Sequence, residues 1–263
     1  MLEFKEENGK EKWNEFIINN QESFLQSFEW GQFQKALGKK VWRFGIFRDG
    51  LVVAEIQIIK ETFPLRRKSF FYIPFGPIFE KNIETEERKE IFNLLFRKIT
   101  QIAKKEGAIF LRIEPLFPFF EKENFEIPPR RIQPQKTLLL DLRKEEEDIF
   151  KNFTYKVRYN IRLSGRKGVR IEFKDEYLSE FYELIKKTAR KDQFRPFNEE
   201  YYKKLFDVVS KDFKVKLCLA NYRGKIIAAN ILIFFGKNSI GVHGASDWKY
   251  KILKAPNLLQ WER

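Results

Sequence analysis

Residues 41–60 read VWRFGIFRDGLVVAEIQIIK, and this stretch indicates the fold more directly than any other. Two apolar runs, 41–48 and 51–60, flank the dipeptide Asp49-Gly50. A short Asp-Gly connection between apolar runs is typical of a tight β-hairpin turn. We therefore expect antiparallel β-structure at the centre of the first half of the chain.

Helical and strand patterns alternate on both sides of this hairpin. Apolar residues at helical spacing predict three helices, and Gly38 stands where a helix C-cap is expected. A strand that we take to be buried ends at Glu114-Pro115, and a proline-rich loop follows it. The expected elements are helices 11–19, 28–37 and 85–105, strands 69–74, 108–113 and 137–142, and the loop 115–136.

The second half begins near residue 145 and shows the same order of helices, antiparallel strands and a further helix. Arg223-Gly224 predicts a second hairpin within it. The expected elements are helices 145–153, 155–166, 177–191 and 199–209, and strands 168–173, 214–222, 225–235 and 239–243. These patterns predict a mixed α/β (α+β) class with two domains, 1–144 and 145–263, that are related in fold without a repeat in sequence.

The chain is strongly basic. Its 263 residues carry 51 Lys and Arg against 37 Asp and Glu, a formal net charge of +14. Such an excess favours an anionic partner, although a genome-wide bias towards lysine would also produce it. Hydrophobic residues make up 43% of the sequence, enough for a sizeable core.

Cysteine and histidine are scarce, which excludes several kinds of site. Cys218 is the sole cysteine, so no intramolecular disulfide can form, which fits a reducing compartment. His243 is the sole histidine and cannot by itself supply a two-histidine metal site. The longest uncharged apolar run, 226–235, is far shorter than the roughly 20 residues that span a bilayer. We therefore expect a cytoplasmic protein with no metal and no cofactor.

The strongest local feature is the segment 151–171, KNFTYKVRYNIRLSGRKGVRI, which holds seven basic residues and no acidic one. Arg158, Arg162 and Arg166 lie four residues apart, so a helix would place all three on one face. The arginine fork suits phosphate oxygens, and this pattern predicts a phosphate-binding surface. A solvated helix face remains the alternative.

Five further residues are candidates for chemistry. Arg195 stands between an aromatic residue and a proline, close to Tyr201 and Tyr202. Glu114 ends a strand, where a carboxylate could accept a proton from an attacking amine, or could form a structural salt bridge with Arg112. His243 is either a titrating base or a packing residue.

Several segments together resemble the Fem-type (FemABX) peptidyltransferases, which build the interpeptide bridge of bacterial peptidoglycan. Their order and spacing carry the resemblance from residue 26 to residue 262. The matching pieces are Gln26-Ser27, Trp30-Gly31, Tyr72-Ile73-Pro74, Gly76-Pro77, Leu111 to Pro115, Thr137 to Leu142, Arg158 to Arg162, Gly168-Val169, Arg195-Pro196, Tyr201-Tyr202, Gly244-Ala245-Ser246 and Ala255 to Glu262.

The resemblance implies two domains of acyl-CoA N-acyltransferase (GNAT) fold that work without acetyl-CoA. It also implies an aminoacyltransferase, which moves an amino acid from aminoacyl-tRNA to an amine on a UDP-linked or lipid-linked muropeptide. We accordingly expect a monomer that acts in the cytoplasm, with peripheral contact at the inner face of the membrane through a lipid-linked acceptor.

The resemblance also assigns roles to residues of this sequence. Arg195 matches the arginine that holds the precursor phosphates, and Tyr201 or Tyr202 matches a tyrosine of the same site. Glu114 matches the acidic position proposed as a base. His243 stands where a substrate-contacting tyrosine is common. The phosphate-binding lysine of the first domain aligns with Gln34, so that Lys35 could replace it only if the helix were rotated or shifted.

Other functions stay open at this point. An aminoacyl-tRNA-dependent transferase that modifies proteins would share the fold and the donor, and a non-enzymatic module would bind tRNA through the basic helix. The integral kind of lipid aminoacyltransferase is disfavoured because a membrane segment is missing. Residues 255–263 look like the opening of a helix, and the resemblance implies further strands and a Phe-Lys pair beyond them. We therefore expect the second domain to be incomplete at residue 263 and its transfer activity to be impaired.

Overall fold

The computed structural model describes residues 2–63, 68–116, 125–134 and 136–263. The chain divides into two compact units. The first comprises Met1–Lys136 with Phe235–Asn238, and the second comprises Thr137–Phe234 with Ser239–Arg263. The domain ranges 1–144 and 145–263 stay predictions.

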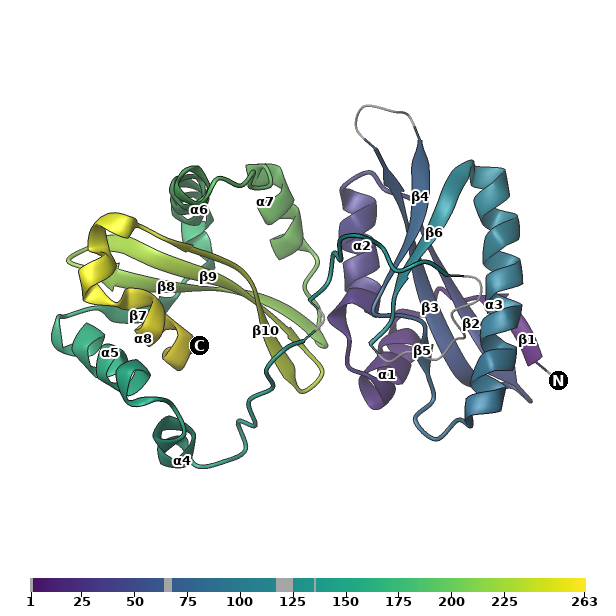
Figure 1. The fold of residues 1–263 in the computed structure, drawn as a ribbon, viewed down its shortest axis with the longest axis horizontal. Coiled ribbons are helices and arrows are strands. Elements are labelled where there is room, and N and C mark those ends of the chain that lie inside the picture. Colours follow the sequence, from purple (N-terminus) through teal and green to yellow (C-terminus); the bar gives the residue numbers. More distant parts are fainter. Residues whose placement is uncertain (1, 64–67, 117–124, 135) are drawn as a thin grey trace. The chain divides into compact units, whose positions relative to one another are not determined.

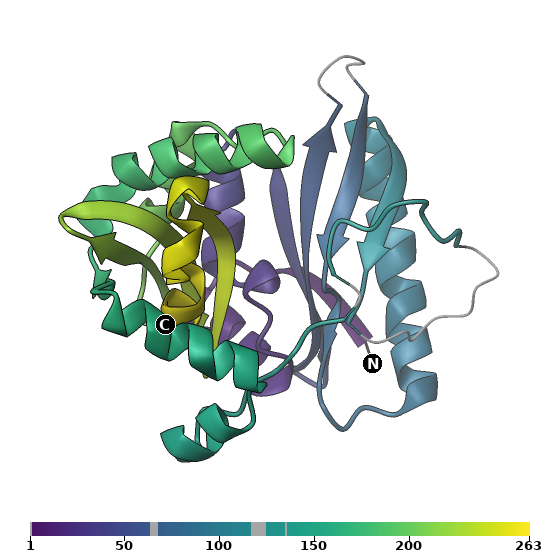
Figure 2. The ribbon, with the colours of Figure 1, turned by 60° about the vertical axis from the view of Figure 1, so that its left-hand side comes forward.

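The first unit is a mixed sheet with helices on both faces (Figures 1 and 2). The strand order is β1-β2-β3-β4-β6, with β5 paired to β3. Among the described strands, β4 and β6 pair in parallel and the other pairs are antiparallel. The helices α1, η1 and α2 lie over one face and α3 over the other. The elements are β1 (Leu2–Glu6), α1 (Lys10–Asn20), η1 (Phe24–Gln26), α2 (Phe28–Ala36), β2 (Val41–Arg48), β3 (Leu51–Thr62), β4 (Ser69–Pro74), β5 (Ile78–Phe79), α3 (Thr85–Glu106) and β6 (Ala108–Glu114).

Side chains that alternate between the two faces of the central strands build the core of this unit. Ile56 and Ile58 of β3 point to the same face and pack in one cluster with Ile91, Leu95 and Ile99 of α3. The spacing of the three α3 residues is that of one helix face. One face of α3 is therefore buried, as the amphipathic pattern of residues 85–105 predicts.

The second unit is a four-stranded sheet in the order β10-β9-β8-β7. Helices α5 and α8 cover one face, and α6 and α7 cover the other (Figures 1 and 2). Cys218 is fully buried in the core beneath α5 and α8. The elements are α4 (Glu146–Lys151), α5 (Tyr155–Arg166), β7 (Arg170–Phe173), η3 (Asp175–Tyr177), α6 (Leu178–Asp192), α7 (Glu199–Asp207), β8 (Phe213–Tyr222), β9 (Lys225–Phe235), β10 (Asn238–Ser246), η4 (Trp248–Leu253) and α8 (Ala255–Glu262).

Both predicted hairpins are confirmed, and their backbone explains why. Asp49 and Gly50 have φ values of 51° and 82°, and Arg223 and Gly224 have 51° and 78°. Two successive positive φ values are the mark of the tight turn whose twist matches that of the flanking strands. The mixed α/β class is also confirmed by the two sheets and their covering helices.

Three expectations about strands were wrong or incomplete. Residues 137–142 form no strand, and Leu138 and Leu139 are 90% and 84% exposed, because no neighbour among the described residues pairs with this apolar run. The strand predicted as buried at 108–113 is the half-exposed edge strand β6, whose one partner among the described strands is β4. Strand β1 was not anticipated in a short segment rich in charge. None of the helices in the described part of the chain is long and apolar enough to cross a membrane.

Candidate functional site

An aromatic cluster lies where α7 faces strand β10 in the second unit. Its members are Phe197, Tyr201, Tyr202 and His243. Phe197 belongs to the loop between α6 and α7, and both tyrosines stand in the first turn of α7. The side chain of Asn198 begins that helix by accepting a hydrogen bond from the Tyr201 N–H at 3.0 Å. The cap thereby orients the two tyrosines against His243 on the neighbouring strand.

The rings of this cluster have defined relative orientations. Phe197 stacks on Tyr201 with ring centres 3.9 Å apart and an interplanar angle of 7°. The His243 ring stands nearly perpendicular to the other three, with ring centres 5.2 Å from Tyr202, 5.7 Å from Tyr201 and 5.9 Å from Phe197. The structure thus brings His243 together with Tyr201 and Tyr202, which lie far from it in the sequence and were predicted separately.

The cluster is uncharged at neutral pH. Burial lowers the pKa of His243 to about 4. Burial also raises the pKa of Tyr202 to about 12 and that of Tyr201 well above its ordinary value. A neutral imidazole accepts one hydrogen bond and donates another, and each phenol keeps its proton. The cluster can therefore bind apolar and polar parts of a ligand but supplies no positive charge of its own.

Arg195 is the positively charged residue close to the cluster in sequence. This side chain lies on the α6–α7 loop, two residues before Phe197, and is exposed. It makes no hydrogen bond or ion pair with any residue of the described ranges. An unpaired guanidinium with its five donors free is suited to bind a phosphate or carboxylate. Arg195 shortly precedes Phe197, Tyr201 and Tyr202 in the chain, and we call Arg195 and the aromatic cluster the α6–α7 site.

The predicted arginine stripe on α5 is used in part within the protein. Arg158 donates to the carbonyl oxygens of Lys151, at 2.8 Å, and Phe153, at the C-terminal end of α4. The Arg162 guanidinium lies 4.9 Å from the centre of the Phe150 ring. Arg166 is exposed and has no such contact within the described segments. The phosphate contact predicted for the three arginines stays a prediction, and Arg166 is the member most available for it.

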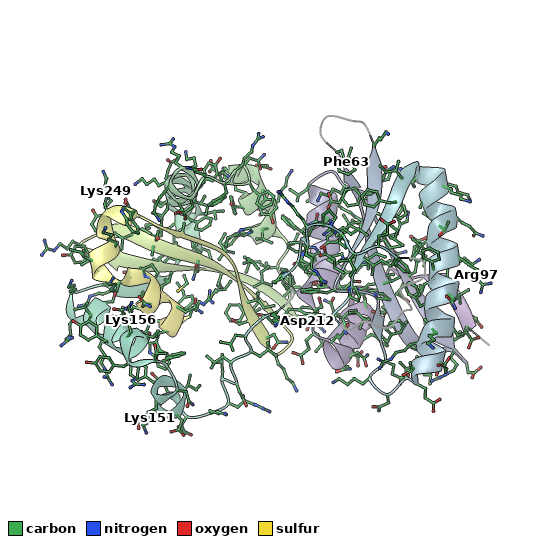
Figure 3. The ribbon with its side chains drawn as sticks, in the orientation of Figure 1. Phe63, Arg97, Lys151, Lys156, Asp212 and Lys249 are labelled. Atoms are coloured by element: carbon green, nitrogen blue, oxygen red, sulfur yellow. The ribbon has the colours of Figure 1, made fainter. Side chains whose placement is uncertain are left out.

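Sequence reasoning missed two tyrosines on the same helix. Tyr155 is 77% exposed, Tyr159 is 46% exposed, and their ring centres lie 6.5 Å apart. Lys156 between them is also exposed (Figure 3). Their spacing of four residues within a basic helix was the available signal, because interleaved aromatic and basic side chains are typical of surfaces that bind single-stranded nucleic acid.

Glu114 closes strand β6 of the first unit, and its carboxylate is fully engaged. Arg112 Nε and the Ile132 N–H both donate to Oε1 at 2.9 Å. The Tyr72 hydroxyl and the Gln133 N–H donate to Oε2 at 2.9 and 2.8 Å. Burial alone would raise the pKa of Glu114, but these hydrogen bonds outweigh it and hold the pKa below its ordinary value. The base predicted here stays a prediction, and the contacts favour a carboxylate that holds residues 132–133 in place.

Lys35 and Gln34 lie on different sides of α2. Gln34 is buried, with its Oε1 lacking a partner in the described structure, whereas Lys35 is exposed. Lys35 lines an open hollow of about 440 Å³ together with Lys39 and Lys40. Partial burial and the nearby Arg43 lower the pKa of Lys35. A phosphate contact by Lys35 stays a prediction. With α2 as observed, the phosphate would have to bind in this hollow.

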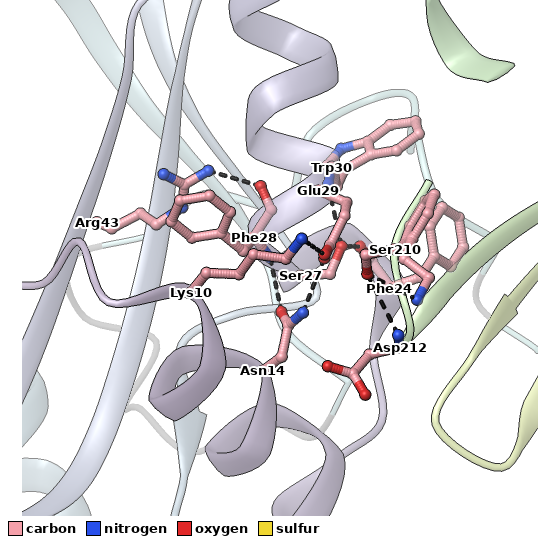
Figure 4. A network of polar contacts seen from close by, with 11 residues as sticks. Lys10, Asn14, Phe24, Ser27, Phe28, Glu29, Trp30, Arg43, Ser210 and Asp212 are labelled. Atoms are coloured by element: carbon pink, nitrogen blue, oxygen red, sulfur yellow. Dashed lines mark hydrogen bonds and ion pairs between the residues drawn. The ribbon is translucent and has the colours of Figure 1, made fainter. Parts of the chain in front are cut away.

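A buried polar network underlies η1 and α2 (Figure 4). Asn14 Nδ2 donates to Glu29 Oε2 at 2.8 Å, and Asn14 Oδ1 accepts from the Phe28 N–H at 2.9 Å. Arg43 Nη2 donates to the Phe28 carbonyl at 2.7 Å, and its guanidinium lies 3.9 Å from the centre of the Phe28 ring. The Lys10 ammonium pairs with Glu29 at 3.1 Å. None of these residues was singled out from the sequence, because their partners lie far apart in the chain.

Comparison with protein families decides the assignment of the chain. The model of the FemAB family matches residues 9–127 and 124–224. The chain belongs to the FemAB family. The resemblance inferred from the sequence is thereby confirmed.

This FemAB chain is similar in sequence to known transferases. It is 26% identical over 212 residues to the Lipid II:glycine glycyltransferase of Staphylococcus aureus, an alignment that covers 74% of this chain and 49% of the relative. The chain therefore spans about half the length of the curated relatives it matches.

Solved structures support the fold of this FemAB chain. The crystal structure of FemX superposes with a TM-score of 0.80 at 18% identity and covers 99% of this chain and 84% of FemX. A tandem GNAT protein from the clavulanic acid biosynthesis pathway superposes with a TM-score of 0.50 at 10% identity and covers 100% of this chain and 84% of that protein. The expected GNAT-like architecture is thus confirmed, while likenesses at these identities concern the fold alone.

Proposed function

We propose that this protein transfers an amino acid from an aminoacyl-tRNA to an amine on the stem peptide or bridge of a peptidoglycan precursor. Membership of the FemAB family supports this. The name of the Staphylococcus aureus relative describes transfer of glycine to lipid II, which supports a lipid-linked acceptor. The net charge of +14 suits a polyanionic donor and an acceptor that carries a diphosphate. A UDP-linked precursor has the same diphosphate chemistry.

The reaction requires no covalent intermediate on the protein. The neutral amine of the acceptor attacks the ester carbonyl of the aminoacyl-tRNA, an amide bond forms and the ester bond breaks. The proton that leaves the amine ends on the ribose hydroxyl of the tRNA. A protein accelerates such a step by holding the two substrates in line and by stabilising the developing oxyanion. Binding and positioning residues are therefore the main contribution expected from this chain.

The α6–α7 site is the observation that carries the proposal. Arg195 offers an unpaired guanidinium to the precursor diphosphate, and the neutral wall of Tyr201, Tyr202 and His243 borders the same loop. A charged anchor beside an uncharged aromatic wall matches an acceptor whose diphosphate is joined to a sugar and a peptide. We place the tRNA contact on the exposed face of α5, where Arg166 is available and Tyr155 and Tyr159 provide rings for stacking.

We further propose that the chain acts as a monomer in the cytoplasm, at the inner face of the membrane when the acceptor is lipid-linked. We keep the domain ranges 1–144 and 145–263 as the working division of the chain. Lys35 is retained as a candidate phosphate contact of the first domain, and Glu114 as a candidate base whose positioning role has the stronger support.

A transfer assay tests the proposal. The purified chain is incubated with tRNA charged with a labelled amino acid and with either a UDP-linked or a lipid-linked muropeptide, and the label is followed by chromatography. Label in the muropeptide is the expected result. Arg195→Ala should reduce this transfer, whereas Arg190→Ala, which removes another exposed arginine near the end of α6, should leave it unchanged.

Three other results would contradict the proposal in different ways. Label in a protein acceptor instead of the muropeptide would indicate a protein-modifying transferase. Equal binding of charged and uncharged tRNA without transfer would indicate a tRNA-binding module. Equal transfer by Arg195→Ala and Arg190→Ala would remove the α6–α7 site from the mechanism.

A further inference from the structure

The short turn η4 of the second unit carries two large hydrophobic side chains in solvent. Trp248 is 55% exposed and Ile252 is 62% exposed. Leu253, at the end of the same turn, is buried in the core beneath α5 and α8. The turn is therefore fixed to the unit by one side chain while two others of similar apolar character stay outside.

Lysines surround the exposed tryptophan. The ammonium groups of Lys191 and Lys251 lie 4.2 and 4.3 Å from the Trp248 ring centre. Lys249 is exposed at the same turn (Figure 3). We call Trp248, Lys249, Lys251, Ile252 and Lys191 the Trp248 patch. It combines a ring, a branched aliphatic chain and clustered positive charge.

Acidic groups near the Trp248 patch do not cancel its charge. The Asp247 side chain is buried and accepts hydrogen bonds from the Lys249 N–H at 3.1 Å and from the Lys187 ammonium at 3.2 Å. Asp192 pairs with Lys191 at 3.1 Å. The charges of Lys249 and Lys251 have no such carboxylate partner within the described ranges, so the patch is positive.

The backbone of the turn is held in place before any partner arrives. Asp247 caps its first residues, and the Lys167 ammonium donates to the Ile252 carbonyl at 2.9 Å from the C-terminal end of α5. The tryptophan ring is also held by the two flanking ammonium groups. A preformed surface loses little conformational entropy on binding, which favours a docking role.

We propose that the Trp248 patch docks the protein on the acidic headgroups of a membrane. Lysines attract anionic lipids, and an indole ring favours the boundary between headgroups and acyl chains. A branched aliphatic chain such as Ile252 gains free energy by entering that boundary but cannot stack on a nucleotide base. This is what favours a membrane over RNA at the patch. The contact is peripheral, as expected for a protein whose described helices are too short or too polar to span a bilayer.

This docking goes beyond the proposed transfer reaction, because the patch is defined without reference to either substrate. It would bring the protein to the surface that holds a lipid-linked acceptor. The same surface would be used if the acceptor were a different lipid-linked molecule.

Vesicle binding tests the docking surface without any peptidoglycan precursor. Its result is therefore independent of the result of the transfer assay. Sedimentation with phosphatidylcholine vesicles, with and without phosphatidylglycerol, gives the apparent affinity. We expect binding only when phosphatidylglycerol is present. Trp248→Ala with Ile252→Ser should weaken it by about tenfold or more. Lys249→Gln with Lys251→Gln should weaken it by about fivefold for each lysine. The matched control Leu51→Ser, at a 74% exposed residue of the first unit, should bind as the unaltered protein does.

Three results would overturn the proposal. The first is equal binding to both kinds of vesicle. The second is wild-type vesicle binding by the Trp248→Ala, Ile252→Ser variant. The third is a variant that keeps its affinity for vesicles but loses affinity for tRNA, which would make the patch an RNA surface. Thermal unfolding of each variant checks that the fold is retained.

Discussion

Replacement of Glu114 by glutamine separates a positioning role from a catalytic one. The carboxylate accepts hydrogen bonds from two side chains and two backbone N–H groups, whereas an amide offers only one acceptor oxygen. The amide nitrogen must then face the N–H of either Ile132 or Gln133, neither of which can turn away. The exchange also removes the charge that strengthens the bond from Arg112.

The expected loss of stability follows from these contacts. Loss of the charge assistance costs about 1 kcal/mol, and a buried N–H left without an acceptor costs about 1–3 kcal/mol. We therefore expect Glu114→Gln to lower the free energy of unfolding by about 2–4 kcal/mol in urea titrations. Hydrogen exchange at Ile132 and Gln133 should become faster, because their N–H groups are bonded to this carboxylate.

The pH dependence gives a second readout of the same group. Because the folded pKa of Glu114 lies below the unfolded one, its contribution to stability is complete above an unfolded pKa of about 4.3 and is lost as the pH falls through the folded value. The glutamine variant should lack this part of the acid dependence. A variant with unchanged stability and unchanged exchange, but with transfer lowered by orders of magnitude, would refute positioning and support the base.

Four further outcomes follow from the contacts described above. Arg195→Ala should weaken precursor binding by about 10- to 100-fold in a titration, the range expected for charge-assisted hydrogen bonds, with little change in unfolding. Arg166→Gln should flatten the dependence of tRNA affinity on salt, and an unchanged slope would indicate that this face of α5 is only solvated. Arg158→Gln should instead lower thermal stability, because the partners of Arg158 are backbone carbonyls. The imidazole NMR signal of His243, the only histidine, should titrate near pH 4, and a midpoint near 6.5 would contradict its burial. The free energy of unfolding should fall as the pH drops from about 6.5 towards 4, because the unfolded chain takes up the proton first. Gly31→Ala should destabilise the first unit by about 3 kcal/mol in denaturant, because the added methyl group would overlap two buried side chains, and unchanged stability would refute that packing.

The parts of the fold that depend on local chemistry could be predicted from the sequence. Both turns need two residues with positive φ. Asp49-Gly50 shows two residues that tolerate it, whereas at Arg223-Gly224 only the glycine is of that kind. The apolar run 137–142 misled the prediction, because a strand also needs a hydrogen-bonded neighbour, which a local pattern does not reveal. The exposure of β6 has the same origin, since a position at the sheet edge depends on the order of distant strands.

The candidate site shows the same limit at the level of side chains. Tyr201, Tyr202 and His243 were each named as candidates, but their contact depends on the packing of α7 against β10. The resemblance grouped Tyr201 and Tyr202 with Arg195 before any geometry was known. The hydrogen bond from Arg158 to the end of α4 could not be predicted from the four-residue spacing of the arginines, because such spacing defines a helix face but does not say what covers it.

The FemAB-like segments of the first unit are explained by packing. Gln26 Nε2 donates to the Pro74 carbonyl at 2.7 Å, and Gln26 Oε1 accepts from the Gln57 N–H at 2.8 Å. A Cβ atom on Gly31 would lie 2.1 Å from both Arg43 Nη2 and Gln57 Oε1, so only glycine fits there. Gln26 and Gly31 are therefore constrained by packing inside this chain, whatever the substrate. Substrate contact requires groups whose bonding capacity is not already used inside the fold. Arg195 in the second unit is such a group, whereas Arg43 and Gln57 of the first unit are occupied in holding η1 and α2 to the sheet.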